Sequence, residues 1–232
     1  MQGIIRRLTS EFLGTFALVF IGGGAVVVNY SEGGALGLIG VALAHALVLS
    51  VMVTALMNIS GAHFNPAVTL GLWIAKKTET KSAIMYVVTQ LVAAAAAALL
   101  VKLVLPVVPG EVTSYGVPRI APAVTMTNAI IIEAVLTFFL VSAVFGTAVS
   151  PEAPSVGGFA IGLVLLFDIL VGGPLTGAAM NPARAFGPAL VGMDWHGHAV
   201  YWVGPLAGGA FAGFLWAKVL LPPAPAPAPA RD

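Results

Sequence analysis

The stretch Asn58-Ile59-Ser60-Gly61-Ala62-His63-Phe64-Asn65-Pro66 decides the fold, and it lies inside a run from Gly33 to Ala75 without any charged residue. That run has 43 residues, whereas one membrane-spanning helix needs about 20. Polar side chains, glycine and proline interrupt a helix here. Asn65-Pro66 then favours a new helix, since Asn is a good N-cap and Pro suits the first helical position. We therefore predict a full span followed by a half-helix over 66–75, about 15 Å long.

The composition indicates an integral membrane protein. Of 232 residues, 10 are Lys or Arg and 9 are Asp or Glu, so charged residues make up 8%, against roughly 25% in soluble proteins. Hydrophobic residues reach 59%, the net charge is only +1 and cysteine is absent. We expect no nucleic-acid partner, disulfide or thiolate metal site. Beside the span in the long run, charge-poor stretches predict five more, at 12–30, 82–101, 134–151, 153–173 and 195–217.

The motif occurs twice. Ser60-Gly61-Ala62-His63-Phe64-Asn65-Pro66-Ala67 is echoed 116 residues later by Thr176-Gly177-Ala178-Ala179-Met180-Asn181-Pro182-Ala183. We interpret this as an internal duplication, with repeat one at about 5–105 and repeat two at about 127–221. Each repeat then holds three spans and one half-helix. Because three is odd, the repeats must be inverted in the membrane.

In such an inverted repeat, the N-caps Asn65 and Asn181 should meet near the membrane midplane. Non-helical backbone at that depth is tolerated only where it is buried in protein or lines water. The sequence therefore predicts a polar pathway in an all-α membrane protein with six transmembrane helices and two re-entrant half-helices. We expect one transmembrane channel domain over 1–221 and a Pro/Ala-rich cytoplasmic tail over 222–232.

Lys and Arg residues predict the orientation, because they are enriched on the cytoplasmic side. One side of the predicted bundle carries Arg6, Arg7, Lys76, Lys77, Lys81, Lys218 and Arg231, whereas Lys102 and Arg119 fall near the other. We expect both termini in the cytoplasm. With no targeting segment apparent, the plasma membrane is the expected location of this multi-pass protein.

The paired motifs Asn65-Pro66-Ala67 and Asn181-Pro182-Ala183, the six spans and Arg184 directly after the second motif resemble the aquaporin (major intrinsic protein) family. The resemblance covers nearly the whole chain. It implies a passive channel for water and small neutral solutes in the lipid bilayer, assembled as a homotetramer. It implies no enzyme activity and no cofactor or metal.

The chemistry of such a channel assigns roles to these residues. Water in single file loses hydrogen bonds that the wall must replace. Asn65 and Asn181 can donate, and the N-termini of the half-helices add positive potential that repels protons and cations. Arg184 should face the pore, because it would be costly against lipid. Carbonyl acceptors are expected from the residues before each half-helix: Gly61, Ala62, His63, Gly177, Ala178 and Ala179.

The resemblance also implies a four-residue selectivity filter, formed by His45, Ile169, Ala178 and Arg184. His45 stands where strict water channels usually have Phe, and Ile169 stands where they usually have His. This set is similar to that of the plant vacuolar (tonoplast) subfamily. We expect a somewhat wider filter with one apolar wall, which passes ammonia, urea or hydrogen peroxide as well as water.

Two other functions compete with this interpretation. A glycerol facilitator usually has Asp directly after the motif Arg and a basic residue four positions further on, where this chain has Ala185 and Ala189. It also tends to lack the aromatic pair Tyr201-Trp202. A secondary transporter would share inverted repeats and broken helices, but it would need a coupling-ion site, and the breaks hold only Asn, Gly, Ala, Ser and Thr.

Four charged residues outside the motifs have expected roles. Glu11 and Glu133, at corresponding places of the repeats, should accept hydrogen bonds from loop amides near the half-helices. Asp168 either binds a neighbouring loop or His45, or is satisfied by backbone near the outer surface. Arg119 could reach over the pore mouth.

A solvated turn is favoured over a metal site for Asp194, His196 and His198.

Overall fold

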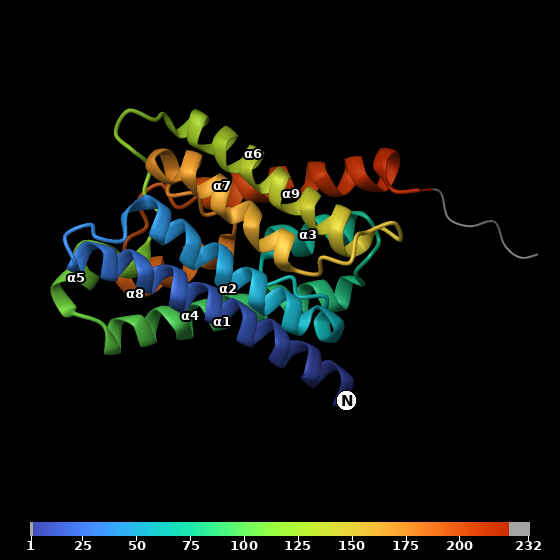
Figure 1. The fold of residues 1–232 in the computed structure, drawn as a ribbon, viewed down its shortest axis with the longest axis horizontal. Helices are drawn as coiled ribbons and strands as arrows, with labels where there is room; N and C mark the ends of the chain where they lie inside the picture. Colours follow the sequence, from blue (N-terminus) through green and yellow to red (C-terminus); the bar gives the residue numbers. More distant parts are fainter. Residues whose placement is uncertain (1, 223–232) are drawn as a thin grey trace, which may run out of the picture.

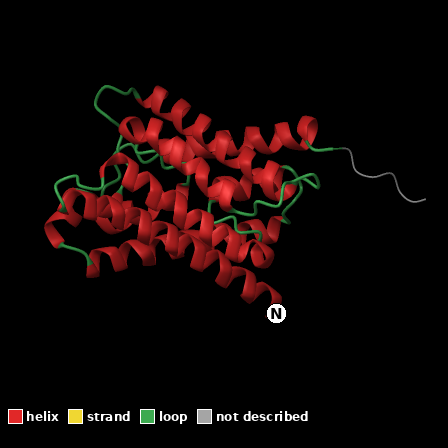
Figure 2. Ribbon diagram, viewed as in Figure 1, coloured by secondary structure: helices red, strands yellow, loops and turns green. Residues whose placement is uncertain are grey.

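The computed structural model describes residues 2–222. Six helices in this part are long and apolar enough to cross a membrane, and they lie side by side along the long axis of the molecule (Figure 1). The described chain contains helices and loops without strands (Figure 2). The spans are α1 (Gln2–Ser31), α2 (Gly37–Ser60), α4 (Thr80–Val104), α6 (Met126–Val144), α7 (Phe159–Thr176) and α9 (Val200–Leu215). The predicted fold class is confirmed.

Short elements extend or connect the spans. A π-helical turn continues α6 as η2 (Phe145–Val149), and another continues α9 as η3 (Trp216–Leu220). Between α4 and α6 lie α5 (Val107–Val112) and η1 (Ser114–Gly116). The beginning of α1 and the end of η3 lie at the same end of the bundle (Figure 1). The predicted tail, 222–232, lies outside the described residues except for its first residue.

Two half-helices complete the bundle, α3 (Pro66–Ile74) and α8 (Pro182–Gly192). At about 1.5 Å per residue, each is roughly half as long as the hydrocarbon core is thick. They begin near the centre and run to opposite ends of the molecule (Figure 1). α3 packs against α9, and α8 packs against α4.

Glycines allow the half-helices to approach the spans closely. A Cβ atom at Gly213 of α9 would collide with the backbone of Gly71 in α3, and one at Gly187 of α8 would collide with the backbone of Ala94 in α4. Small residues at such contacts allow two helix backbones to come together inside a membrane. The close packing fixes where each half-helix begins, and hence where its N-terminal N–H groups point.

The loops before the half-helices share one backbone conformation. Gly61 and Gly177 have φ of 88° and 81°, and the following alanines have 49° and 44°. Phe64 and Met180 have 51° and 52°. Left-handed backbone at non-glycine residues costs on the order of 1 kcal/mol each, so surrounding contacts must hold it in place. The duplicated octets thus form duplicated loops, while the outer bounds of the two repeats stay a prediction.

Candidate functional site

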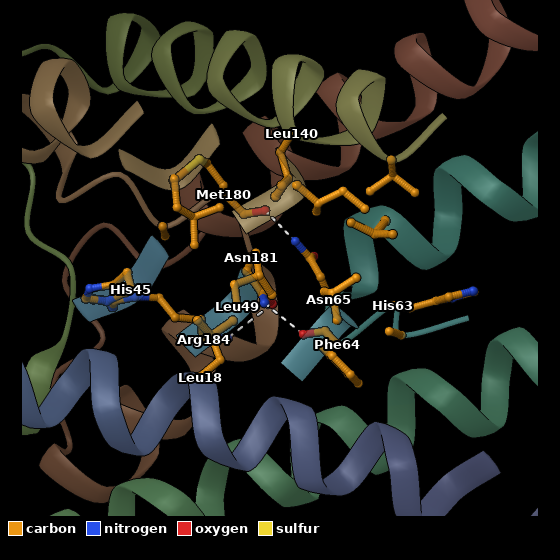
Figure 3. Close-up of a pocket in the computed structure, with 17 residues that line it drawn as sticks. Leu18, His45, Leu49, His63, Phe64, Asn65, Leu140, Met180, Asn181 and Arg184 are labelled. Atoms are coloured by element: carbon orange, nitrogen blue, oxygen red, sulfur yellow. Dashed lines mark hydrogen bonds between the residues drawn. The ribbon is translucent and has the colours of Figure 1, made fainter. Parts of the chain in front are cut away.

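The two motif asparagines connect the halves of the protein. Asn65 donates from Nδ2 to the Met180 carbonyl, and Asn181 donates from Nδ2 to the Phe64 carbonyl, both at 2.9 Å (Figure 3). Each Oδ1 also caps its own half-helix, accepting from the backbone N–H two positions on at 2.8 and 3.0 Å. An amide NH₂ has two hydrogens, so each asparagine keeps one for a molecule in the adjoining cavity.

That central cavity runs along both asparagines, from His63 at one end to His45 and Arg184 at the other (Figure 3). It leaves about 20 Å³ for the centres of water-sized molecules, where a single water needs roughly 10–15 Å³ on this measure. Apolar side chains from α1, α2, α3, α6 and α7 form much of the lining, namely Leu18, Leu49, Val53, Val68, Leu140, Val144, Ile161 and Leu165. The cavity is therefore a narrow path with polar groups concentrated on the motif loops.

Glu11 holds the first loop. It is fully buried, and its carboxylate accepts from the backbone N–H groups of His63 at 3.0 Å and Phe64 at 2.8 Å. The Ser60 hydroxyl and the Gln90 amide donate to it at 2.7 and 2.8 Å. Four hydrogen bonds to one carboxylate compensate for burying its charge.

Glu133 holds the second loop in the same way. Its carboxylate accepts from the N–H groups of Ala179 at 2.9 Å and Met180 at 2.7 Å, and from the Thr176 hydroxyl at 2.7 Å. In a trans peptide the carbonyl points opposite to the N–H of the next residue. The carbonyls of Ala178 and Ala179 therefore point away from Glu133, and by the same reasoning those of Ala62 and His63 point away from Glu11.

Two tyrosines in symmetric positions bind the motif loops, and the sequence did not predict these contacts. Tyr86 donates its hydroxyl to the Ser60 carbonyl, and Tyr201 donates to the Thr176 carbonyl, both at 2.8 Å. Ser60 and Thr176 are the first residues of the two octets, and the tyrosines lie 115 residues apart, close to the repeat offset of 116. That near-match in spacing is the signal that could have identified them.

The central cavity adjoins an outer cavity of about 350 Å³ at His45 and Arg184, because these two residues line both cavities. Arg184 donates from Nη1 to the Gly116 carbonyl at 2.8 Å, while its Nη2 lies 3.5 Å from His45 Nε2. His45 Nδ1 lies 2.9 Å from the Val41 carbonyl. Because a carbonyl can only accept, Nδ1 carries the hydrogen and Nε2 presents its lone pair to Arg184.

The other two expected filter residues occupy different positions. Ile169 lines the outer cavity beside His45 and Arg184. Ala178 is not among the residues that line either cavity; it is buried in the core near Ile169 and Leu136. The structure thus brings three of the four residues together in the lining of the outer cavity, whereas Ala178 is absent from the lining of both cavities.

Neither role predicted for Asp168 is seen. Its side chain is buried in α7, and in the part of the chain that the structure describes its Oδ2 has no hydrogen-bond partner. Asp168 also lines neither the central nor the outer cavity. The sequence could not reveal this, because the direction of a side chain in α7 depends on how that helix packs against α2 and α6.

Arg119 lines the outer cavity, and its Nη2 donates to Asp194 at 3.3 Å and to Ser114 at 2.8 Å. Burial alone would raise the pKa of Asp194, but the Ser114 hydroxyl, the His196 amide and Arg119 hold it below its ordinary value of 3.8. His198 lies 3.0 Å from the Trp202 indole nitrogen, which donates to it. Asp194 and His198 thus have separate partners instead of converging on one point.

Comparisons with known proteins agree with this geometry. The family model described as "Major intrinsic protein" matches residues 2–216. The chain is 42% identical over 231 residues to "Probable aquaporin TIP3-2" of Arabidopsis thaliana, covering 94% of this chain and 85% of the relative. It is 43% identical over 224 residues to "Aquaporin TIP4-4" of Zea mays, covering 92% and 86%.

Among solved structures, the X-ray structure of the aquaglyceroporin from Plasmodium falciparum superposes with a TM-score of 0.82 at 25% identity, covering 94% of this chain and 97% of that one. The paired Asn-Pro-Ala motifs, six spans and two half-helices described above are typical of the same family. The chain therefore belongs to the major intrinsic protein family, the aquaporins, and is a membrane channel, not an enzyme.

Proposed function

We propose that this channel conducts water and excludes protons and ions, and that it also passes ammonia, hydrogen peroxide and, more slowly, urea. The observation that carries the proposal is the place where the central and outer cavities meet, which is lined by His45 and Arg184, two side chains in contact with Nε2 and Nη2 3.5 Å apart. Ammonia and hydrogen peroxide are close to water in width and could use the same path. Urea is wider, so we expect it to pass more slowly.

The central cavity supports selective water passage. Carbonyls of the motif loops can accept hydrogen bonds from water and the free hydrogens of Asn65 and Asn181 can donate, which offsets the bonds lost in single file. Asn65 is the N-cap of α3 and Asn181 is the N-cap of α8. The N-terminus of each helix carries the equivalent of roughly half a positive charge. Together with Arg184 they disfavour a proton or cation but leave neutral molecules unaffected.

Glycerol conduction is the second candidate, because the solved structure that superposes well is an aquaglyceroporin. The filter argues against it in this chain. His45 lines the cavity in contact with Arg184, and Ala185 follows Arg184 where a glycerol facilitator usually has Asp. We therefore expect glycerol to be much slower than water.

We also propose that the channel is a homotetramer whose termini face the cytoplasm. Many large apolar side chains on the outer faces of the bundle are exposed, as a surface against lipid or neighbouring copies requires. The expected plasma membrane gains no support from the relatives, whose printed abbreviation TIP denotes tonoplast intrinsic protein. If their names carry over, the membrane is vacuolar, and microscopy of the tagged chain against markers for both membranes decides between them.

A panel of fluxes into proteoliposomes tests the solute range. Stopped-flow light scattering would follow water, urea and glycerol, and entrapped dyes would follow ammonia and hydrogen peroxide. The proposal predicts rates above those of empty liposomes for water, ammonia and peroxide. Water flux without facilitated ammonia entry would contradict the wider solute range, and glycerol entry as fast as water would favour the second candidate.

A further inference from the structure

A third cavity, which we call the mouth cavity, lies at the end of the pore opposite the filter. It has a volume of about 340 Å³, near the lower end of the range of small-molecule sites. His63 and Val144 line both this cavity and the central one. A molecule bound here would therefore stand directly in the path of water.

The charged side chains that line the mouth cavity are all positive. Arg7 and Lys77 contribute to its lining, whereas no Asp or Glu does. Within residues 2–222, neither basic side chain has a carboxylate oxygen within 4.0 Å. Neutral hydrogen-bonding side chains complete the polar part of the lining, namely Asn58, Ser60, His63 and Thr78.

The general preference for basic residues on the cytoplasmic side does not account for this arrangement. That preference is also satisfied by basic residues that do not line the cavity, namely Arg6, Lys76 and Lys81. Arg7 and Lys77 instead bring positive charge to the pore entrance itself. A channel for neutral molecules has no need of that charge for conduction.

Arg7 is also held in a fixed orientation. Its Nε donates to the Tyr86 hydroxyl at 2.7 Å, and its guanidinium lies over the Tyr86 ring, 5.3 Å from the centroid. Tyr86 in turn donates to the Ser60 carbonyl. In the described chain the two terminal nitrogens of Arg7 form no hydrogen bond. A guanidinium fixed in this way offers its remaining donors to an oxyanion at little entropic cost.

We propose that the mouth cavity binds a small oxyanion of the phosphate class between Arg7 and Lys77, and that the bound anion blocks water flow. The inference rests on the channel activity of the family and adds an inhibitory site to it. The anion could be free in solution or be the phosphate of a lipid headgroup. Both present the same oxygens to the guanidinium fork and the ammonium.

The test measures osmotic water permeability of proteoliposomes with phosphate on both sides, against chloride at equal ionic strength, osmolality and pH. A second arm uses chloride buffer and vesicles that contain a phosphatidylinositol phosphate. Variants Arg7→Gln and Lys77→Gln remove one charge each from the cavity. Lys81→Gln removes the same charge from the same end of the bundle outside the lining and is the matched control.

Phosphate should lower the water permeability of the wild type and of Lys81→Gln. The concentration for half-block should rise about tenfold in Lys77→Gln and at least as much in Arg7→Gln, because each loses a charge-assisted contact. Lys77 is exposed, so its variant should fold even if Arg7→Gln does not. Block only in the second arm would assign the site to a lipid headgroup. Equal permeability in all buffers and vesicles would overturn the site, while water flow in chloride would still support the channel.

Discussion

Arg184 and His45 contact each other where the central and outer cavities meet, with Nη2 of the first 3.5 Å from Nε2 of the second. The Gly116 carbonyl holds Arg184 from one side and the Val41 carbonyl holds His45 from the other. Neither the Gly116 carbonyl nor His45, the two partners of the Arg184 side chain in the described chain, is anionic, so no partner there neutralises the charge of Arg184 where the cavities meet.

Removing the charge should weaken ion exclusion more than water flow. The variant Arg184→Ala lacks a unit charge within a few ångströms of any passing ion, an interaction of about 1–4 kcal/mol. We expect proton or cation leakage to rise at least about fivefold while water permeability is retained. The leak is measured with an entrapped pH dye under a potassium diffusion potential. Arg119→Ala is the control, since it removes equal charge from the outer cavity, and equal leaks in both variants would contradict the assignment.

Gly22 should be required for the position of His45. A Cβ atom at Gly22 would collide with the His45 ring, and the open space that the ring can enter is that of the two cavities it lines. We expect Gly22→Ala to reduce water permeability severalfold. Gly24→Ala on the same helix is the control, because its Cβ would meet only Leu105 at an ordinary 3.5 Å. Permeability of Gly22→Ala equal to that of Gly24→Ala would argue against this packing.

Glu133 should stabilise the second motif loop. In Glu133→Gln the side chain keeps one acceptor oxygen but places an NH₂ group among N–H and O–H donors, which costs about 2–5 kcal/mol. We expect the unfolding temperature in detergent to fall by roughly 5–15 °C and water permeability to fall with it. Glu32→Gln changes an exposed carboxylate and should leave both values unchanged. A Glu133→Gln protein as stable as Glu32→Gln would refute the role of this carboxylate.

Asp194 should add a small stabilisation that depends on pH. Hydrogen bonds from Ser114, His196 and Arg119 hold its pKa below 3.8 despite burial, so the contribution is complete above about pH 4 and is lost as the pH falls through the lower folded-state pKa. Because Arg119 is largely exposed, we expect about 1 kcal/mol or less. Unfolding temperatures of the wild type and Asp194→Asn should therefore differ at pH 6, and the difference should shrink as the pH falls below 3.8 through the lower folded-state pKa. Glu111→Gln is the control, and a difference that grows toward acid would contradict the sign.

Much of the fold could be predicted because the deciding signals are local. The half-helix expected at 66–75 is observed at Pro66–Ile74, since an N-cap asparagine and a proline fix its beginning whatever surrounds it. Charge-free runs gave helices that were too short. α1 begins at Gln2 and includes Arg6 and Arg7, and α6 begins before Glu133, because a helix continues beyond the hydrocarbon core and because hydrogen bonds can compensate a buried carboxylate.

The finer geometry of the site was beyond sequence reasoning. The partners of Asn65 and Asn181, for example, depend on how two segments more than a hundred residues apart pack together. The links from Tyr86 and Tyr201 to the octets are of the same kind. The one sign of such contacts in the sequence is the spacing of the two tyrosines, which is close to the repeat offset.

The most direct test of a selective water channel is the osmotic water permeability of wild-type proteoliposomes measured together with their proton permeability. The account predicts water permeability far above that of empty liposomes, no added proton flux under a potassium diffusion potential, and no inhibition by mercurials, since the chain has no cysteine. Water permeability equal to that of empty liposomes, or a proton flux that rises with it, would contradict the account.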